Sequence, residues 1–235
     1  MLSTYENNRS WSVAGTWRVV RFGLALGLVL MALSAAMSLA NAKPRALTIV
    51  VLGDSLTAGY GLAAENAFPA QLEAALKRRG HAVTIVNAGV SGDTTAAGLQ
   101  RLDWAVPDGT DGVILELGAN DALRGLSPIT TRDNLRAILN KLKARKIPVL
   151  IAGMKSPGNW GTAYIKAFDG IFPDLASSYG HDLYPFFLEG VAVRKEFNQP
   201  DGLHPTAKGV AEIVRRILPT AERFLKRVRE RQDAK

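Results

Sequence analysis

The alternation of short β-branched runs with longer amphipathic segments constrains this chain more than any other feature. Five apolar runs are expected to form strands, over residues 46–53, 82–89, 112–118, 147–153 and 181–187. Segments of helical period follow them, over residues 68–80, 94–102, 130–146, 164–180 and 205–218. Strands that alternate with helices indicate βαβ units, in which helices cover both faces of a parallel sheet. The sequence therefore predicts a single α/β domain with a five-stranded parallel sheet.

The first 42 residues differ in composition from this pattern. A basic segment with three arginines precedes an uncharged apolar run over residues 22–40, which leads into Ala40-Asn41-Ala42. A basic region, an apolar region and small residues at a cleavage site are typical of a secretory signal peptide. The apolar run also approaches the ~20 residues that span a bilayer, so a retained membrane anchor is the alternative.

We expect residues 1–42 to be removed by cleavage between Ala42 and Lys43. The mature protein is then the single domain of residues 43–235, located in the periplasm or secreted. The chain contains no cysteine, which excludes disulfides and thiolate chemistry even in an oxidising compartment.

The formal net charge of the whole chain is +8, and much of the excess lies in the C-terminal segment 223–235. A basic helical tail can contact anionic lipid or nucleic acid, but it is most often a solvated face. Because export separates the protein from nucleic acid, we expect no nucleic-acid partner. At most, the tail is expected to make weak contact with a membrane surface, and we expect the protein to be a monomer.

Four polar, glycine-rich turns follow strands or precede the last helix. They are Gly53-Asp54-Ser55, Val90-Ser91-Gly92-Asp93-Thr94, Gly118-Ala119-Asn120-Asp121 and Asp201-Gly202-Leu203-His204-Pro205. Parallel α/β sheets bind ligands at the carboxyl ends of their strands. We therefore expect these turns to converge at one edge of the sheet.

The residue types in these turns fit a serine nucleophile. A serine attacks only when a base removes its proton, and the base needs an orienting partner. Of the three histidines, His81 and His181 directly precede strands, which places them at the opposite end of the sheet. His204 lies three residues after Asp201, so the spacing predicts a Ser55, His204 and Asp201 set. Taken alone, this last turn favours the alternative, in which Asp201-Gly202 is only a turn and His204 caps the final helix.

Acyl transfer also requires donors for the developing oxyanion. The candidates are the backbone N–H groups of Ser55 and Gly92 and the side-chain amide of Asn120. Gly92 lacks a side chain that would hinder the approach of a substrate. The alternatives are that Gly92 serves only a turn and that Asn120 caps a helix.

Other kinds of site fit the sequence poorly. Thr57 stands where the nucleophile elbow G-x-S-x-G requires its second glycine. A phosphate-binding loop would need a lysine soon after its glycines, and the first lysine after Ser55 is Lys77. The three histidines are dispersed, and Asp54, Asp93 and Asp121 lack the spacing of a cation loop. We therefore expect no metal and no other cofactor.

Taken together, the four turns resemble the SGNH, or GDSL, hydrolases, and among them the secreted bacterial acyl-thioesterase, lysophospholipase and arylesterase group. The matching blocks are GDSLTAGYG (53–61), NAGVSGDTT (87–95), ELGANDALRG (116–125) and DGLHP (201–205). The resemblance implies a three-layer α/β/α sandwich with a flavodoxin-like sheet. It also implies a cofactor-free serine esterase that acts on small-molecule or lipid esters and thioesters.

The resemblance assigns the same roles as the residues themselves. Ser55 would be the nucleophile that carries the acyl group, His204 the general base and acid, and Asp201 its orienting partner. The loop over residues 154–164 lies where the family binds the acyl chain, and its residues Met154, Pro157 and Trp160 are candidate substrate contacts. Alternatives are a carbohydrate O-deacetylase or an acyltransferase with the same triad, or a non-catalytic lipid-binding protein.

Overall fold

The computed structural model describes residues 45–234, so the expected signal peptide and its cleavage site lie outside the described residues. Five strands form one parallel sheet in the order β2-β1-β3-β4-β5. Their bounds are β1 Leu47–Gly53, β2 Val83–Gly89, β3 Gly112–Glu116, β4 Val149–Ala152 and β5 Asp182–Tyr184. This order reverses direction between β1 and β3, as in flavodoxin-like sheets. The predicted fold class is confirmed.

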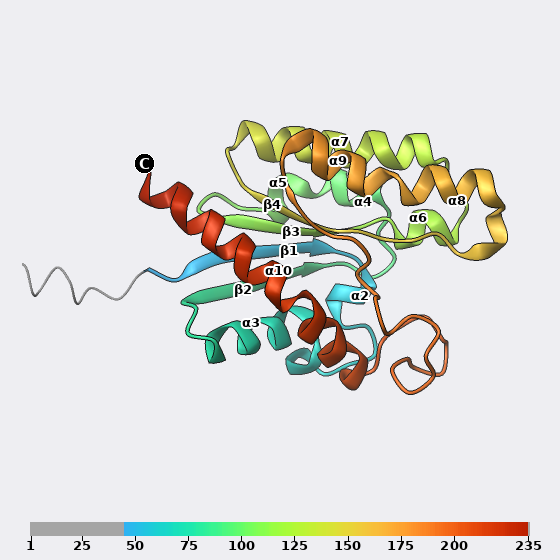
Figure 1. The fold of residues 1–235 in the computed structure, drawn as a ribbon, viewed down its shortest axis with the longest axis horizontal. Coiled ribbons are helices and arrows are strands. Elements are labelled where there is room, and N and C mark those ends of the chain that lie inside the picture. Colours follow the sequence, from blue (N-terminus) through green and yellow to red (C-terminus); the bar gives the residue numbers. More distant parts are fainter. Residues whose placement is uncertain (1–44, 235) are drawn as a thin grey trace, which may run out of the picture. The chain divides into compact units, whose positions relative to one another are not determined.

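Helices cover both faces of the sheet and make a three-layer sandwich (Figure 1). On one face, α3 (Phe68–Arg78) packs against α10 (Ala207–Asp233). On the other face lie α4 (Thr95–Gln100), α5 (Leu102–Ala105), α7 (Pro128–Ala144) and α9 (Ile171–Tyr179). Because both faces are covered, β3 and β4 are buried along their whole length, which explains the apolar runs GVIL and VLIA.

Shorter helices occupy the loops. They are α2 (Ser55–Ala58), α6 (Ala119–Leu123), α8 (Thr162–Asp169) and the 3₁₀ turns Ala64–Asn66 and Gly158–Trp160. Helices α2 and α6 begin directly after β1 and β3, respectively. Two of the four predicted turns therefore become helix starts at the carboxyl edge of the sheet.

The helix expected over residues 164–180 is instead two helices, α8 and α9, which meet at Gly170. Pro173 explains the break, because its ring clashes with the carbonyl of the fourth residue before it in a continuous helix. That residue is Asp169, the last of α8. The expected single helix was wrong at this point.

The last helix differs from its predicted range of 205–218 at both ends. It begins at Ala207, and it continues past Pro219 to Asp233, so the basic tail is part of it. Apolar residues recur with helical spacing on both sides of Pro219 and keep one face against the sheet. Phe224 and Val228 are buried against Gly112 of β3. Packing therefore compensates for the hydrogen bond that the proline lacks.

Among residues 45–234, no helix is both long and apolar enough to cross a membrane. The longest helix, α10, buries a stripe of apolar side chains, and its basic side chains lie outside this stripe. One of these basic side chains, Arg227, forms an ion pair with Asp182 of β5 at 3.2 Å.

Candidate active site

Ser55 stands at a sharp turn from β1 into α2. Asp54 caps this helix, since its Oδ1 accepts a hydrogen bond from the N–H of Leu56 at 2.9 Å. Gly53 allows the turn because the Thr57 side chain lies close to its backbone, and a Cβ at Gly53 would clash with Thr57 Oγ1. The strand, the glycine and the cap together place Ser55 at the first position of the helix.

The structure brings Ser55 together with His204 and Asp201. His204 Nε2 lies 2.9 Å from Ser55 Oγ, and His204 Nδ1 lies 2.7 Å from Asp201 Oδ2. The other oxygen, Asp201 Oδ1, accepts the backbone N–H groups of His204 at 3.0 Å and Leu203 at 2.9 Å. The hydrogen bonds from His204 and Leu203 lower the pKa of Asp201 to about 2. A carboxylate held in this way remains charged beside the imidazole at neutral pH.

The loop that carries His204 is fixed by its own backbone. The N–H of Gln199 donates to the carbonyl of His204 at 2.8 Å, and Asn198 forms a bridge with Pro205. Thr206 caps α10, with its side chain accepting the N–H of Gly209 at 3.2 Å. His204 therefore does not cap the last helix, and the cap alternative for this residue is excluded.

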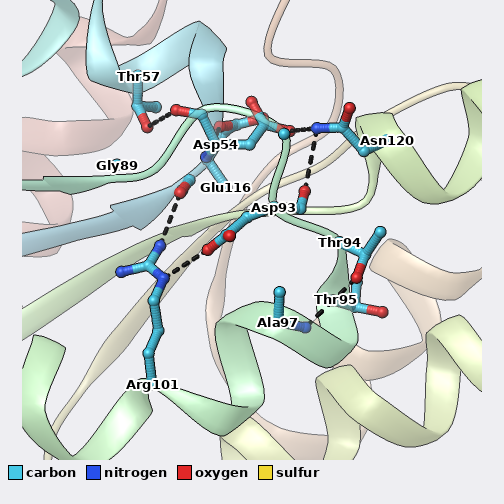
Figure 2. Close-up of polar contacts among 12 residues, drawn as sticks. Asp54, Thr57, Gly89, Asp93, Thr94, Thr95, Ala97, Arg101, Glu116 and Asn120 are labelled. Atoms are coloured by element: carbon cyan, nitrogen blue, oxygen red, sulfur yellow. Dashed lines mark hydrogen bonds and ion pairs between the residues drawn. The ribbon is translucent and has the colours of Figure 1, made fainter.

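The side-chain amide of Asn120 joins the turns that follow β1, β2 and β3 (Figure 2). Its Nδ2 donates to the carbonyl of Asp93 at 3.0 Å and to Asp54 Oδ2 at 3.2 Å. The cap of α6 is Gly118, so Asn120 does not cap a helix. Gly92 has a φ of +87°, a conformation that favours glycine.

A cavity of about 460 Å³ opens over Ser55, Asn120 and His204. Apolar side chains form much of its wall: Met154, Pro157, Phe186, Leu188, Val193 and Leu203. Met154 and Pro157 thus line the cavity over Ser55, and their role as substrate contacts stays a prediction. Trp160 does not line this cavity, because its ring packs over Gly125 and beside Tyr164, with ring centroids 5.9 Å apart.

The family model of GDSL-like lipases and acylhydrolases matches residues 51–211, which is more than half of the chain. The chain belongs to this family. The esterase TesA of Pseudomonas aeruginosa is 36% identical over 191 residues, covering 81% of this chain and 95% of the relative. The arylesterase of Vibrio mimicus is 40% identical over 193 residues, covering 80% and 94%.

A solved structure supports the same assignment. The SGNH-hydrolase family esterase AlinE4 is 49% identical and superimposes with a TM-score of 0.66, covering 78% of this chain and 99% of AlinE4. The resemblance predicted from the four turns is confirmed. The prediction of an ester hydrolase is confirmed at the level of the family, since these three relatives are all named as esterases.

The other two histidines of this GDSL-family chain lie at the opposite edge of the sheet, as predicted. His81 precedes β2 and lies 3.3 Å from Glu222 of α10. His181 precedes β5, and burial lowers its pKa to about 4, so the ring is neutral at physiological pH. Both histidines are thus remote from Ser55.

The carboxylates considered as cation ligands, Asp54, Asp93 and Asp121, accept hydrogen bonds from protein groups instead. Asp121 accepts the N–H of Thr95 at 2.8 Å and its hydroxyl at 2.6 Å. Asp93 pairs with Arg101 at 2.5 Å. Within residues 45–234, no group of three or more histidine or acidic side chains is placed to hold a metal ion.

Two buried ionisable residues of the GDSL-family site were missed from the sequence. Arg101, only 5% exposed, pairs with Asp93 and donates from Nη2 to the carbonyl of Gly53 at 2.8 Å (Figure 2). Glu116, the last residue of β3, is fully buried. An acid at the end of the otherwise apolar run GVILE was a signal for Glu116, whereas nothing near Arg101 distinguished it from a surface arginine.

Proposed function

We propose that this chain is a serine esterase in which Ser55, His204 and Asp201 form the catalytic triad. The observation that carries the proposal is the unbroken chain of contacts from Asp201 through His204 to Ser55 Oγ. Asp201 fixes the ring so that Nδ1 donates to the carboxylate, which leaves Nε2 free to accept the serine proton.

In the first half of the reaction, Ser55 Oγ attacks the carbonyl carbon of the ester while its proton moves to His204 Nε2. The tetrahedral intermediate then collapses, and His204 returns the proton to the departing alcohol or thiol. The acyl group remains on Ser55. In the second half, a water attacks this acyl-enzyme, gives its proton to His204, and releases the acid as Ser55 recovers its proton.

The oxyanion of each tetrahedral intermediate needs donors fixed before the reaction. We assign this role to the N–H groups of Ser55 and Gly92 and to the amide of Asn120. The turn that carries Gly92 lies beside the one that carries Ser55, since the N–H of Val90 donates to the carbonyl of Gly53 at 3.0 Å. The contacts of Asn120 with Asp54 and Asp93 hold its amide at the same edge. Because these contacts use both N–H groups, one N–H leaves the Asp93 carbonyl to donate to the oxyanion.

The apolar wall of the cavity indicates the substrate class. Met154, Phe186 and Leu188 offer surface to an acyl chain, and a volume of about 460 Å³ suits chains of small to medium length. The leaving group would then extend toward solvent, where both alcohols and thiols fit. We therefore propose small-molecule or lipid esters and thioesters as substrates, with no cofactor and no nucleic-acid partner.

A panel of p-nitrophenyl esters of graded chain length, beside acyl-CoA, a lysophospholipid and an acetylated sugar, tests this assignment. We expect turnover of the short and medium esters that is unchanged by EDTA, because attack depends on Ser55 and His204 and not on a metal. Loss of activity on chelation that a divalent ion restores would contradict the mechanism. Preference for the acetylated sugar would favour the O-deacetylase alternative, and no turnover at all would favour a lipid-binding protein.

We also propose that the protein is exported and acts as a monomer in the periplasm or outside the cell, with at most a weak membrane contact through α10. The N-terminal sequence pattern supports export. Intact mass measurement on protein recovered from the secreting cell should give a mature chain that begins at Lys43. A membrane-bound product that retains residues 1–42 would support the anchor alternative instead.

A further inference from the structure

The proposed triad leaves one buried acid beneath the site without a role. Glu116 ends β3 and lies opposite Gly53 of β1 in the sheet register. Its side chain has no exposed surface, and none of the ion pairs within residues 45–234 includes it. Its Oε2 lies 3.4 Å from the N–H of Asp54, and its Oε1 has no hydrogen-bond partner among the described residues. A carboxyl group enclosed in this way requires an explanation, because burial of an unpaired charge is strongly unfavourable.

The surroundings of Glu116 favour its neutral form. Burial and the neighbouring Asp54 carboxylate raise the pKa of Glu116 well above its usual value. Burial also raises the pKa of Asp54, to about 6, while the N–H of Leu56 and the amide of Asn120 stabilise its charge. When two acids interact closely, the one with more donors keeps the charge and the other keeps the proton. At neutral pH, the charge therefore lies on Asp54 and the proton on Glu116.

Asp54 connects two parts of the proposed machinery. Its Oδ1 accepts the N–H of Leu56, which fixes the start of the helix that carries Ser55, and its Oδ2 accepts the amide of Asn120. The other ionisable groups near this carboxylate are His204 and Asp93, and Arg101 contacts Asp93 and the carbonyl of Gly53. A rotation of the Asp54 carboxylate would therefore displace Ser55 and Asn120 together.

We propose that Glu116 is a positioning residue, a neutral carboxylic acid that donates a hydrogen bond to the Asp54 carboxylate and thereby holds it as the shared acceptor for the start of α2 and for Asn120. This inference rests on the proposed function and extends it. Glu116 touches neither the substrate nor the reacting atoms. It acts through Asp54, and it acts in its acid form.

Two substitutions distinguish three roles of Glu116: a neutral hydrogen-bond donor, a charged carboxylate, and a side chain that only fills the core. Glu116→Gln keeps a neutral donor of nearly the same shape, so kcat should remain within about threefold of the wild type. Glu116→Leu removes the donor, so kcat should fall by about 10- to 100-fold with little change in KM, because Ser55 and Asn120 are misplaced. Glu222→Gln, at the opposite edge of the sheet beside His81, is the matched control and should leave both constants unchanged.

Two patterns would overturn the proposal. If Glu116→Gln loses as much activity as Glu116→Leu, the carboxylate and not the acid is required. If both variants unfold at lower temperature with unchanged kcat, Glu116 only fills the core. Should Glu116→Leu fail to fold, the infrared difference spectrum of Glu116→Gln against wild type decides. The wild type should show the C=O stretch of a protonated carboxylic acid at neutral pH, and its absence contradicts the proposal.

The same preparations distinguish this inference from the proposed function. A fluorophosphonate that fails to label Ser55 in the wild type would show that the triad assignment itself is wrong. Normal labelling of the wild type, with an equally fast reaction in Glu116→Leu, would leave the triad standing and remove the positioning role of Glu116.

Discussion

Replacement of Ser55 by alanine should lower kcat for p-nitrophenyl ester hydrolysis by at least about 10⁴-fold. The substitution removes the oxygen that lies 2.9 Å from His204 Nε2, and with it the acyl-enzyme route. Because Ser55 is only partly buried and its hydroxyl contacts His204 at the surface of the cavity, we expect little change in thermal stability. Steady-state kinetics and a thermal melt of the same preparation measure both quantities.

Ser178→Ala is the matched control for this experiment. Ser178 is also a helical serine, but it lies in α9 and donates to the carbonyl of Asp174. The control should retain wild-type turnover. Activity of Ser55→Ala within a factor of about ten of the wild type would mean that another group carries the reaction.

The second large effect is expected for Asn120→Ala. If the amide stabilises the oxyanion, its removal should lower kcat by about 10²–10³-fold with little change in KM, because the contact is strongest when the carbonyl oxygen is charged. The same amide also joins Asp54 to the carbonyl of Asp93, so the free energy of unfolding should fall by about 1–2 kcal/mol. The donors at Ser55 and Gly92 should leave some activity above background.

Kinetics and urea unfolding on one preparation separate these two contributions. Asn134→Ala provides the comparison, since Asn134 is also partly buried and its amide donates to Thr95 Oγ1 at 3.1 Å, away from the cavity. This control should lose stability and keep its turnover. Normal kcat in a destabilised Asn120→Ala protein would remove Asn120 from the oxyanion hole and leave it a structural role.

The features that the sequence predicted correctly all depend on local chemistry. The apolar runs of β1, β3 and β4 and their flanking glycines indicate buried parallel strands from composition alone. The turns after parallel strands lie at the carboxyl edge of the sheet, so the turns at Ser55, Gly92 and Asn120 were expected at one edge. Because polar turn residues at strand ends are visible in the sequence, this edge was predictable before any contact was known.

The features that were missed depend on packing between distant segments. Trp160 lies in the expected loop, but its ring packs against Gly125 of another loop and therefore lies outside the cavity. Likewise, α10 continues past Pro219 because Phe224 and Val228 are buried against β3 of the sheet. Local preference predicted an earlier end, and tertiary contacts outweighed it.

Arg101 shows the same limit within the site. Its partners, Asp93 and the carbonyl of Gly53, come from the turn after β2 and the end of β1, and only the folded sheet brings them together. The register of β1 with β3 likewise places Glu116 next to Gly53, beside Asp54. Sequence spacing carries no information about such pairings between strands.

The most direct test of the central claim is labelling with a fluorophosphonate, followed by intact mass measurement and peptide mapping. A fluorophosphonate reacts with a serine whose proton a neighbouring base removes, which is the state that we assign to Ser55. We predict a single adduct per chain, located on Ser55 and absent in Ser55→Ala. A folded protein that takes up no label, or one that carries the adduct on a different residue, would contradict the account.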